Sequence, residues 1–104
     1  MAQLDVFVNP ITQARRAYPY VAVLQSDLAD TGRERIVAPL APKAKLTGTT
    51  GRLTPHVRVL DADHVLLVPN LAAVAVNDLR ELRGQLTAHR DAIVAALDYL
   101  FLGV

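Results

Sequence analysis

The stretch HVRVLDADHVLLVPN, residues 56–70, carries the clearest indication of the fold. Apolar and polar residues alternate over 56–60, the triplet 61–63 can form a polar turn, and the returning segment 64–68 is apolar after its histidine. Alternation with a period of two is typical of a strand with one buried face. Two such runs joined by a short polar segment predict a β-hairpin, which the following Pro-Asn pair terminates.

The chain after the hairpin predicts one more strand and then a helix. The unbroken apolar run LAAVAV at 71–76 indicates a strand buried on both faces. Beyond it, apolar residues recur three or four positions apart within two groups: Leu79, Leu82 and Leu86, then Ile93, Leu97, Leu100 and Phe101. This spacing predicts a helix over about 87–102, with Thr87 as its N-cap and Gly103 as its C-terminal stop. We expect Gly84 to separate the helix from a short turn that holds the first two leucines.

Before the hairpin, three further segments have the composition of strands. They are rich in β-branched residues and lie at 4–10, 18–26 and 33–40. The segment 41–55 contains two glycines and two prolines and is the most loop-like part of the chain. Five or six short strands followed by one helix favour a small antiparallel β-barrel or sandwich, with the helix packed across it.

Length and composition indicate one domain with an aliphatic core. The chain has 104 residues, of which 52% are hydrophobic and 5% aromatic. This apolar content excludes a disordered chain. So high a content in so small a domain also favours a buried subunit interface, for which a symmetric homodimer is the usual form.

Composition also disfavours several classes of protein. The absence of cysteine excludes disulfide scaffolds, thiolate metal sites and cysteine nucleophiles. No run approaches the roughly 18 apolar residues that a membrane span needs. The first ten residues do not resemble a secretory signal, so we expect a cytoplasmic location. The formal net charge of +1 argues against general nucleic-acid binding, although positive charges outnumber negative ones over 33–58.

Few residues suggest catalysis. Asp27 and Asp30 could act as a general acid–base pair, but two aspartates in a turn are common for conformational reasons alone. Arg33 and Arg35 occupy alternate positions of a predicted strand, so they share a face on which they could hold a phosphate. For both pairs, the sequence favours the plainer interpretation of turn chemistry and an exposed strand face.

The remaining candidates concern RNA and metals. Arg15 and Arg16 lie beside Tyr18 and Tyr20 and could form a stacking surface for RNA, although tyrosines are also ordinary strand residues. The histidines of the chain are His56, His64 and His89. Their spacing does not suggest a shared metal, and we expect the two in the hairpin on its exposed face. We therefore expect no metal and no other cofactor.

Three segments resemble the CcdB toxins. VLQSDLADTGRERIVAPL at 23–40 is similar to the family's most recognisable part, in which a strand, a Gln-Ser-Asp turn and a strand ending in Pro-Leu follow in this order. HRDAIVAALDYLFLGV at 89–104 is similar to the family's C-terminal helix, which closes on Phe, an aromatic residue, Gly and an aliphatic residue. Between them, 53–76 matches in its layout of a Leu-x-Pro entry, a hairpin and an apolar strand. The resemblance covers nearly all of the chain.

The resemblance implies a toxin of a type II toxin–antitoxin module. Members of this family are homodimers of an SH3-like barrel with one C-terminal helix. They are not enzymes, and they act by binding the A subunit of DNA gyrase and trapping the gyrase–DNA cleavage complex. A CcdA-like antitoxin binds the dimer, and their complex represses its own operon. Contact with operator DNA would therefore come only through the antitoxin complex.

Carried over by position, the gyrase-binding site lies mainly at the end of the chain. Its tail is Leu102, Gly103 and Val104, and lesser contacts fall on Ser26, Leu28, Ala29 and Asp98. The side chains that precede the tail at helical spacing are expected to pack against the barrel or the dimer mate: Leu97, Leu100 and Phe101. Leu102 stands where the best-known members have a tryptophan that stacks on a gyrase arginine, so a cation–π contribution of roughly 0.5–2 kcal/mol is missing.

Two alternatives remain open from the sequence. An attenuated or inert member of the family would bind an antitoxin without poisoning gyrase, and Leu102 favours this alternative. An endoribonuclease of the MazF and Kid kind would use Arg33 or Arg35 to stabilise charge on the scissile phosphate, assisted by Asp27 or Thr31. The Gly-aliphatic end of the chain speaks against the endoribonuclease.

Overall fold

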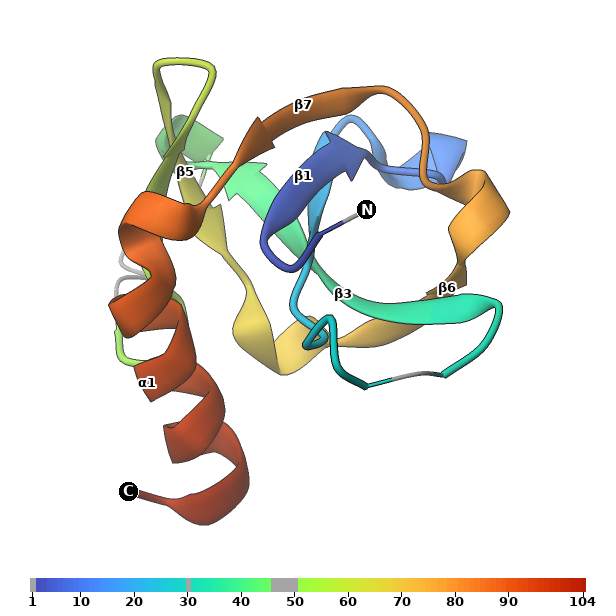
Figure 1. Ribbon diagram of the computed structural model, residues 1–104. Coiled ribbons are helices and arrows are strands. Elements are labelled where there is room, and N and C mark those ends of the chain that lie inside the picture. The colour runs from blue at the N-terminus through green and yellow to red at the C-terminus, as the bar shows by residue number, and fades with distance from the viewer. Residues whose placement is uncertain (1, 30, 46–50) are drawn as a thin grey trace.

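The computed structural model describes residues 2–29, 31–45 and 51–104. Within these ranges the chain forms seven strands, one α-helix and several short 3-10 turns (Figure 1). The strands are β1 (Asp5–Val8), β2 (Tyr20–Val23), β3 (Glu34–Pro42), β4 (His56–Val59), β5 (Ala62–Leu66), β6 (Ala72–Ala75) and β7 (Leu82–Gln85). The helix α1 covers Arg90–Leu102. The 3-10 turns are η1 (Thr12–Ala14), η2 (Lys43–Lys45), η3 (Val68–Asn70), η4 (Val76–Asp78) and η5 (Thr87–His89).

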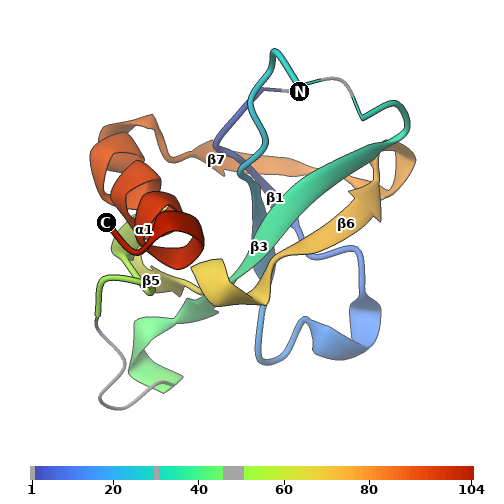
Figure 2. The same ribbon diagram turned by 90° about the horizontal axis from the view of Figure 1, so that it is seen from below.

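The strands form one antiparallel sheet in the order β4–β5–β3–β2–β1–β7, and β6 pairs with β3 off this path. On one edge of β3, residues 37–40 pair with β2. On the other edge, residues 34–37 pair with β6 and residues 40–42 pair with β5. Because β3 changes partner along one edge, the sheet curls around it (Figures 1 and 2). This is the mainly β, SH3-like barrel with one C-terminal helix that the resemblance implies.

The predicted hairpin is formed by β4 and β5, and its turn is shorter than expected. Val59 pairs with Ala62, so the turn consists of Leu60 and Asp61 rather than the triplet 61–63. Both turn residues have positive φ, 51° and 62°. Positive φ at both central residues is the type I′ geometry, whose twist matches that of the flanking strands. Arg58 braces the turn by donating through one terminal nitrogen to the Asp61 carbonyl at 2.6 Å.

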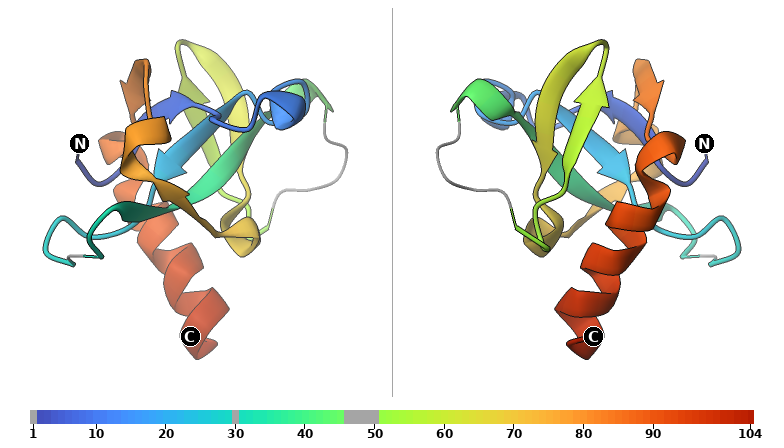
Figure 3. Two further views of the ribbon diagram at one scale, coloured as in Figure 1. Left: turned by 90° about the vertical axis from the view of Figure 1, so that its right-hand side faces the viewer. Right: turned by 90° about the vertical axis from the view of Figure 1, so that its left-hand side faces the viewer.

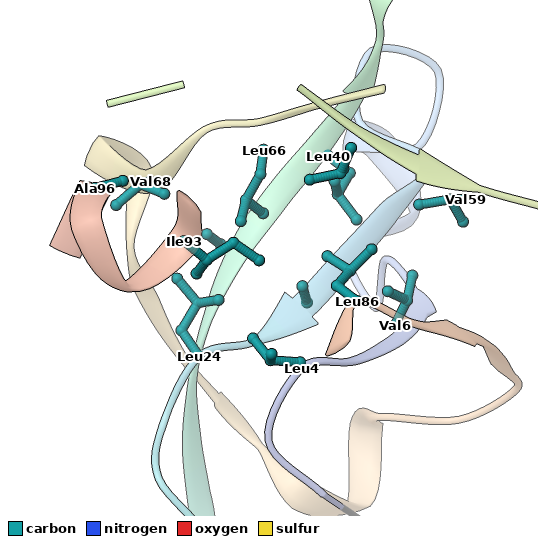
Figure 4. Close-up of a cluster of buried hydrophobic side chains, with 13 residues drawn as sticks. Leu4, Val6, Leu24, Leu40, Val59, Leu66, Val68, Leu86, Ile93 and Ala96 are labelled. Carbon is teal, nitrogen blue, oxygen red and sulfur yellow. The ribbon is translucent and has the colours of Figure 1, made fainter. Parts of the chain in front are cut away.

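The strands β1, β2 and β3 are buried on both faces, because alternate residues point to opposite sides and each side is covered. The larger cluster lies between the sheet and α1 (Figure 4) and contains Leu4, Val6, Ala22, Leu24, Ala38, Leu40, Val57, Val59, Leu66, Val68, Leu86, Ile93 and Ala96. The smaller cluster uses the intervening positions and consists of Phe7, Val21, Val23, Val37 and Leu79. Double burial explains why the apolar runs in these strands are nearly continuous.

The expectation that 71–76 is buried on both faces is wrong. Ala72 and Ala73 are exposed, and Val74 and Ala75 are only partly buried. β6 pairs with the first half of β3 and lies at the rim of the sheet, where neither face is fully covered. An apolar run of small residues therefore does not by itself identify a central strand.

The segment expected to be a turn before the helix is the strand β7. It pairs antiparallel with β1, Asp5 with Gln85 and Val6 with Gly84. The register shifts after Val6, so Arg83 is the extra residue of a β-bulge. The helical spacing of the leucines is misleading here, because Leu82 is exposed in the strand.

The helix begins at Arg90 rather than at the predicted Thr87. The hydroxyl of Thr87 donates to the side-chain oxygen of Gln85 and does not cap α1. The predicted C-terminal stop is confirmed, since Gly103 has a φ of 73° and its N–H donates to the Tyr99 carbonyl at 3.0 Å. Among the described residues, no helix has the length and apolar character that crossing a membrane requires.

The helix is anchored by its first turns. Ile93 and Ala96 are buried, and Ile93 lies among side chains of the larger cluster that come from different parts of the sheet (Figure 4). Leu97 and Leu100 are partly buried and pack against the same cluster, as expected. Phe101 is 66% exposed and does not pack against the barrel.

Replacing Ile93 with alanine should destabilise the fold strongly. Removing a fully buried isoleucine side chain costs about 2–5 kcal/mol, because it loses transfer free energy and leaves a cavity. The neighbouring Val94 is 38% exposed, so Val94→Ala should change the free energy of unfolding by no more than about 0.5 kcal/mol. Urea unfolding followed by circular dichroism at one protein concentration measures both. Equal costs for the two variants would contradict the packing described for α1.

Candidate partner-binding surface

The end of α1 presents an apolar surface to solvent. Phe101, Leu102 and Val104 are 66%, 71% and 74% exposed, whereas Ile93 and Ala96 are buried. The side chains thus change from buried to exposed along α1, whose C-terminal half extends away from the barrel (Figures 1 and 3). Neighbouring exposed apolar side chains are typical of an interaction site. We refer to residues 102–104 as the tail.

Gly103 sets the direction of the tail. Its φ of 73° is in the left-handed region, which glycine adopts without the strain that a Cβ atom causes. Its N–H closes the helix on the Tyr99 carbonyl. A Cβ atom built at this position would have no neighbour within 4 Å. Backbone conformation, and not lack of space, is therefore what requires glycine here.

A contact that the sequence does not predict joins α1 to residues 51–54. The guanidinium carbon of Arg52 lies 3.9 Å from the centre of the Tyr99 ring, within the range of a cation–π interaction. Such a contact contributes about 0.5–1 kcal/mol at an exposed site. Gly51 and Thr54 form an isolated antiparallel bridge, which holds the backbone on either side of Arg52. No local pattern could reveal this pair, because its members are far apart in the sequence.

The second group of expected contacts lies in the turn between β2 and β3. Leu28 at its tip is 96% exposed. The hydroxyl of Ser26 accepts the N–H of Leu28 at 3.1 Å, and the Ser26 carbonyl accepts the N–H of Ala29 at 3.1 Å. A serine that closes its own turn in this way displays the intervening side chain to solvent.

Gln25 holds this turn against β3 and is a residue that the sequence analysis missed. Its amide nitrogen donates to the Ala29 carbonyl at 2.6 Å and to the Thr31 hydroxyl at 2.9 Å. Its amide oxygen accepts the N–H of Ile36 at 3.1 Å. The Gln-Ser-Asp motif marks the place, but nothing in the motif says that glutamine carries the bridging role.

The expected gyrase contacts fall into two separate places. Asp98 is exposed and shares the end of α1 with the tail. The turn that contains Ser26, Leu28 and Ala29 lies apart from α1 (Figures 1 and 3). In Figure 1 both places are on the lower side of the molecule, and η3 lies between them. Within one chain, the tail and the turn are therefore distinct surfaces.

The residues considered for acid–base chemistry take part in the chain's own structure. Asp27 accepts the backbone N–H of Gln3 at 2.7 Å through Oδ1. Asp30, its expected partner, lies outside the described residues. The hydroxyl of Thr31 donates to the Glu34 carbonyl at 2.6 Å. These contacts favour turn formation over a catalytic assembly.

Arg33 and Arg35 do share one face, as their spacing predicts. With Ala75, Val76 and Asn77 they line an open cleft of about 730 Å³ between β3 and η4. One terminal nitrogen of Arg35 donates to two backbone carbonyls of its own turn, both at 2.8 Å. This arginine therefore stabilises the entry to β3.

The residues considered for RNA binding do not form one surface. Arg15 donates through Nε to a backbone carbonyl at 2.6 Å. Arg16 and Tyr18 line a pocket of about 450 Å³. Tyr20 packs against the larger core cluster, and its ring lies 5.5 Å from that of His64, measured between centroids. The two tyrosines thus have different surroundings.

The histidines lie in three different settings. His64 is 5% exposed, and its Nδ1 lies 3.0 Å from a backbone carbonyl, so the expectation that it faces solvent is wrong. The physical reason is that β5 is paired along both edges and this position is covered by Tyr20. His56 is exposed beside Asp63, at 3.3 Å. His89 accepts a backbone N–H of β4 at 3.2 Å through Nε2. In the part of the chain that the structure describes, no three histidine or carboxylate side chains gather as metal ligands would.

Comparison with known proteins identifies a family to which the chain is similar. A family model described as CcdB protein matches residues 3–103 of the chain. The matched range takes in every strand, α1 and both groups of expected contacts up to Gly103. No curated protein matches the chain.

Replacing Gln25 with alanine should destabilise the turn between β2 and β3. The variant leaves the N–H of Ile36 without its side-chain acceptor, and an unsatisfied partly buried donor costs about 1–3 kcal/mol. Amide hydrogen exchange at Ile36, together with urea unfolding, measures the effect. Gln13→Ala, in the exposed turn η1, is the matched control and should leave both measurements unchanged. Unaltered exchange at Ile36 in Gln25→Ala would contradict this role.

Proposed function

The chain belongs to the CcdB family, the toxins of toxin–antitoxin modules, and on this premise we propose that it binds the A subunit of DNA gyrase and traps the gyrase–DNA cleavage complex. The observation that carries the proposal is the exposed apolar tail at the end of α1. The tail occupies the positions at which the family's main gyrase contacts fall. The exposed turn at Ser26, Leu28 and Ala29 and the carboxylate of Asp98 supply the secondary contacts.

Burial of the tail explains how the chain would bind without an aromatic residue at position 102. Burying a leucine or valine side chain contributes about 1.5–3 kcal/mol. Leu102 and Val104 are largely exposed, so nearly all of this gain is still available to a partner. Ile93 and Ala96 anchor α1, and a tail on a rigid support loses less conformational entropy on binding.

A homodimer is part of the proposal. The turn and the tail lie apart within one chain, and two copies related by symmetry would bring four such surfaces to one partner. Phe101 supports this arrangement, because it is exposed in the single chain and is therefore available to a dimer mate. A dimer would also increase affinity through simultaneous attachment at two sites.

The proposed activity is not enzymatic and takes place in the cytoplasm, where a CcdA-like antitoxin would bind the dimer. Operator DNA would be contacted only through the antitoxin complex. Asp27, Thr31 and Arg35 each make hydrogen bonds within their own turn and its neighbours, which argues against the endoribonuclease alternative. Purified chain that cleaves single-stranded RNA would overturn this part of the proposal.

Replacing Leu102 with aspartate tests the role of the tail. A charge in an apolar contact must be desolvated without a partner, so affinity for a gyrase A fragment should fall at least tenfold, which corresponds to about 1.4 kcal/mol. Leu82→Asp is the matched control, since Leu82 is a similarly exposed leucine on β7. Calorimetry measures binding, and accumulation of cleaved DNA measures poisoning. Growth arrest that no gyrase A variant relieves would contradict gyrase as the target.

Replacing Leu102 with tryptophan should strengthen the same contact. The larger ring adds buried area and a π face, and a cation–π term of about 0.5–2 kcal/mol would raise affinity by roughly twofold to thirtyfold. The comparison is the dissociation constant of both forms for one gyrase A fragment. A chain that poisons gyrase only after this substitution would identify the natural sequence as the inert alternative.

A further inference from the structure

We infer that Arg52 belongs to the partner-binding surface and selects partners that place a carboxylate beside the apolar site for the tail. The inference rests on the proposed function for the identity of the partner and extends it by naming a specificity residue. Nothing in the resemblance assigns a role to this position.

The side chain of Arg52 is held in place although it is exposed. Its guanidinium stacks on Tyr99 at 3.9 Å from the ring centre. The bridge between Gly51 and Thr54 and a hydrogen bond from the Gly51 N–H to the Thr54 hydroxyl at 3.1 Å hold the adjoining backbone. Pro55, the next residue, is buried. A cation presented in this way is organised before a partner arrives.

The hydrogen-bonding edge of this guanidinium is available. Stacking uses the flat face of the group and leaves its N–H donors in the plane. Most arginines donate to atoms of the chain itself: Arg15, Arg35, Arg58, Arg80, Arg83 and Arg90. Arg52 makes no hydrogen bond or ion pair with any other residue in 2–29, 31–45 or 51–104. As far as these described ranges are concerned, its donors are free to bind a ligand from outside.

Arg52 borders the tail because of helix geometry. Positions three and four apart lie on one face of a helix, so Tyr99 shares its face with Leu102 and Gly103. The segment that carries Arg52 runs beside α1 in two perpendicular views (Figures 1 and 2). One surface therefore combines exposed apolar side chains with a fixed cation at its edge.

Charge complementarity defines the occupant of this surface. A planar guanidinium matches a carboxylate through two parallel N–H donors, and such pairs are stronger than neutral hydrogen bonds. One face of the cation is already covered by Tyr99, so only the other face is open to a partner aromatic ring. A partner arginine or lysine that faced the guanidinium of Arg52 itself, rather than the side chain of residue 102, would be repelled. The fitting partner has an apolar pocket with an aspartate or glutamate at its rim.

The test compares binding of Arg52 variants to the gyrase A fragment. Arg52→Gln should weaken binding at least tenfold and make it less sensitive to salt, because a charged pair is lost. Arg52→Lys should recover only part of the affinity, because lysine cannot form the two parallel bonds. Arg33→Gln is the control, since Arg33 is exposed and lies just before the first residue of β3. Equal affinity of Arg52→Gln and the unmodified chain overturns the inference and leaves the proposed function standing.

Two further measurements separate recognition from simple support of the helix. Amide exchange at Leu102 and Gly103 reports whether the last turn stays formed in Arg52→Gln, and unchanged exchange with weakened binding supports recognition. Faster exchange that fully accounts for the weaker binding overturns it.

Arg52→Glu should regain affinity for a gyrase A variant in which a rim carboxylate is replaced by lysine, and no regain at any acidic rim position counts against the inference. If the unmodified chain does not bind the fragment, the proposed function fails and the inference falls with it.

Discussion

The strand β3 is the element on which the rest of the structure depends, because neighbouring strands occupy both of its edges and side chains cover both of its faces. One edge of β3 pairs first with β6 and then with β5, and this change of partner explains why the strand can contain a proline. Pro39 lies between the segment that pairs with β6 and the segment that pairs with β5. Its carbonyl points to that edge and accepts the N–H of Leu67 at 2.9 Å. Proline lacks a backbone donor, and at this junction the sheet requires none.

The burial of apolar side chains differs between the two ends of α1. Its first turns are fixed by the core, and its last turn carries apolar side chains that no part of the described chain buries. Buried side chains in the first part stabilise the fold. The exposed apolar side chains of the second part can still be buried by a partner. The Arg52–Tyr99 stack adds a charge at the boundary between the two parts. One helix thereby combines anchoring, display and a means of selecting partners.

The sequence predicts those features that depend on neighbouring residues. The hairpin, the C-terminal helix and its glycine stop follow from alternation, spacing and backbone preference, and the resemblance to CcdB toxins supplies the barrel. Pairing between distant segments is not encoded in such patterns. The four-residue spacing of Leu82 and Leu86 suggests that β7 leads into a helix, whereas the segment is a strand whose partner β1 is far away in the sequence. The burial of His64 and the exposure of β6 differ from expectation for a related reason, since burial depends on which strands surround a residue. The contact between Arg52 and Tyr99 has no sequence signal at all.

The pairing of β1 with β7 also governs when the protein can fold. The first strand of the barrel lacks a partner until β7 has been made, after all the other strands, and Leu4 and Val6 are covered only when Leu86 and α1 are present. Contacts between segments so far apart in the chain slow folding, because a long loop must close before they form. While it is being made, the chain therefore exposes apolar strands without completing the barrel. The surface proposed to harm the cell lies on α1 and is therefore made only after the strand that closes the barrel.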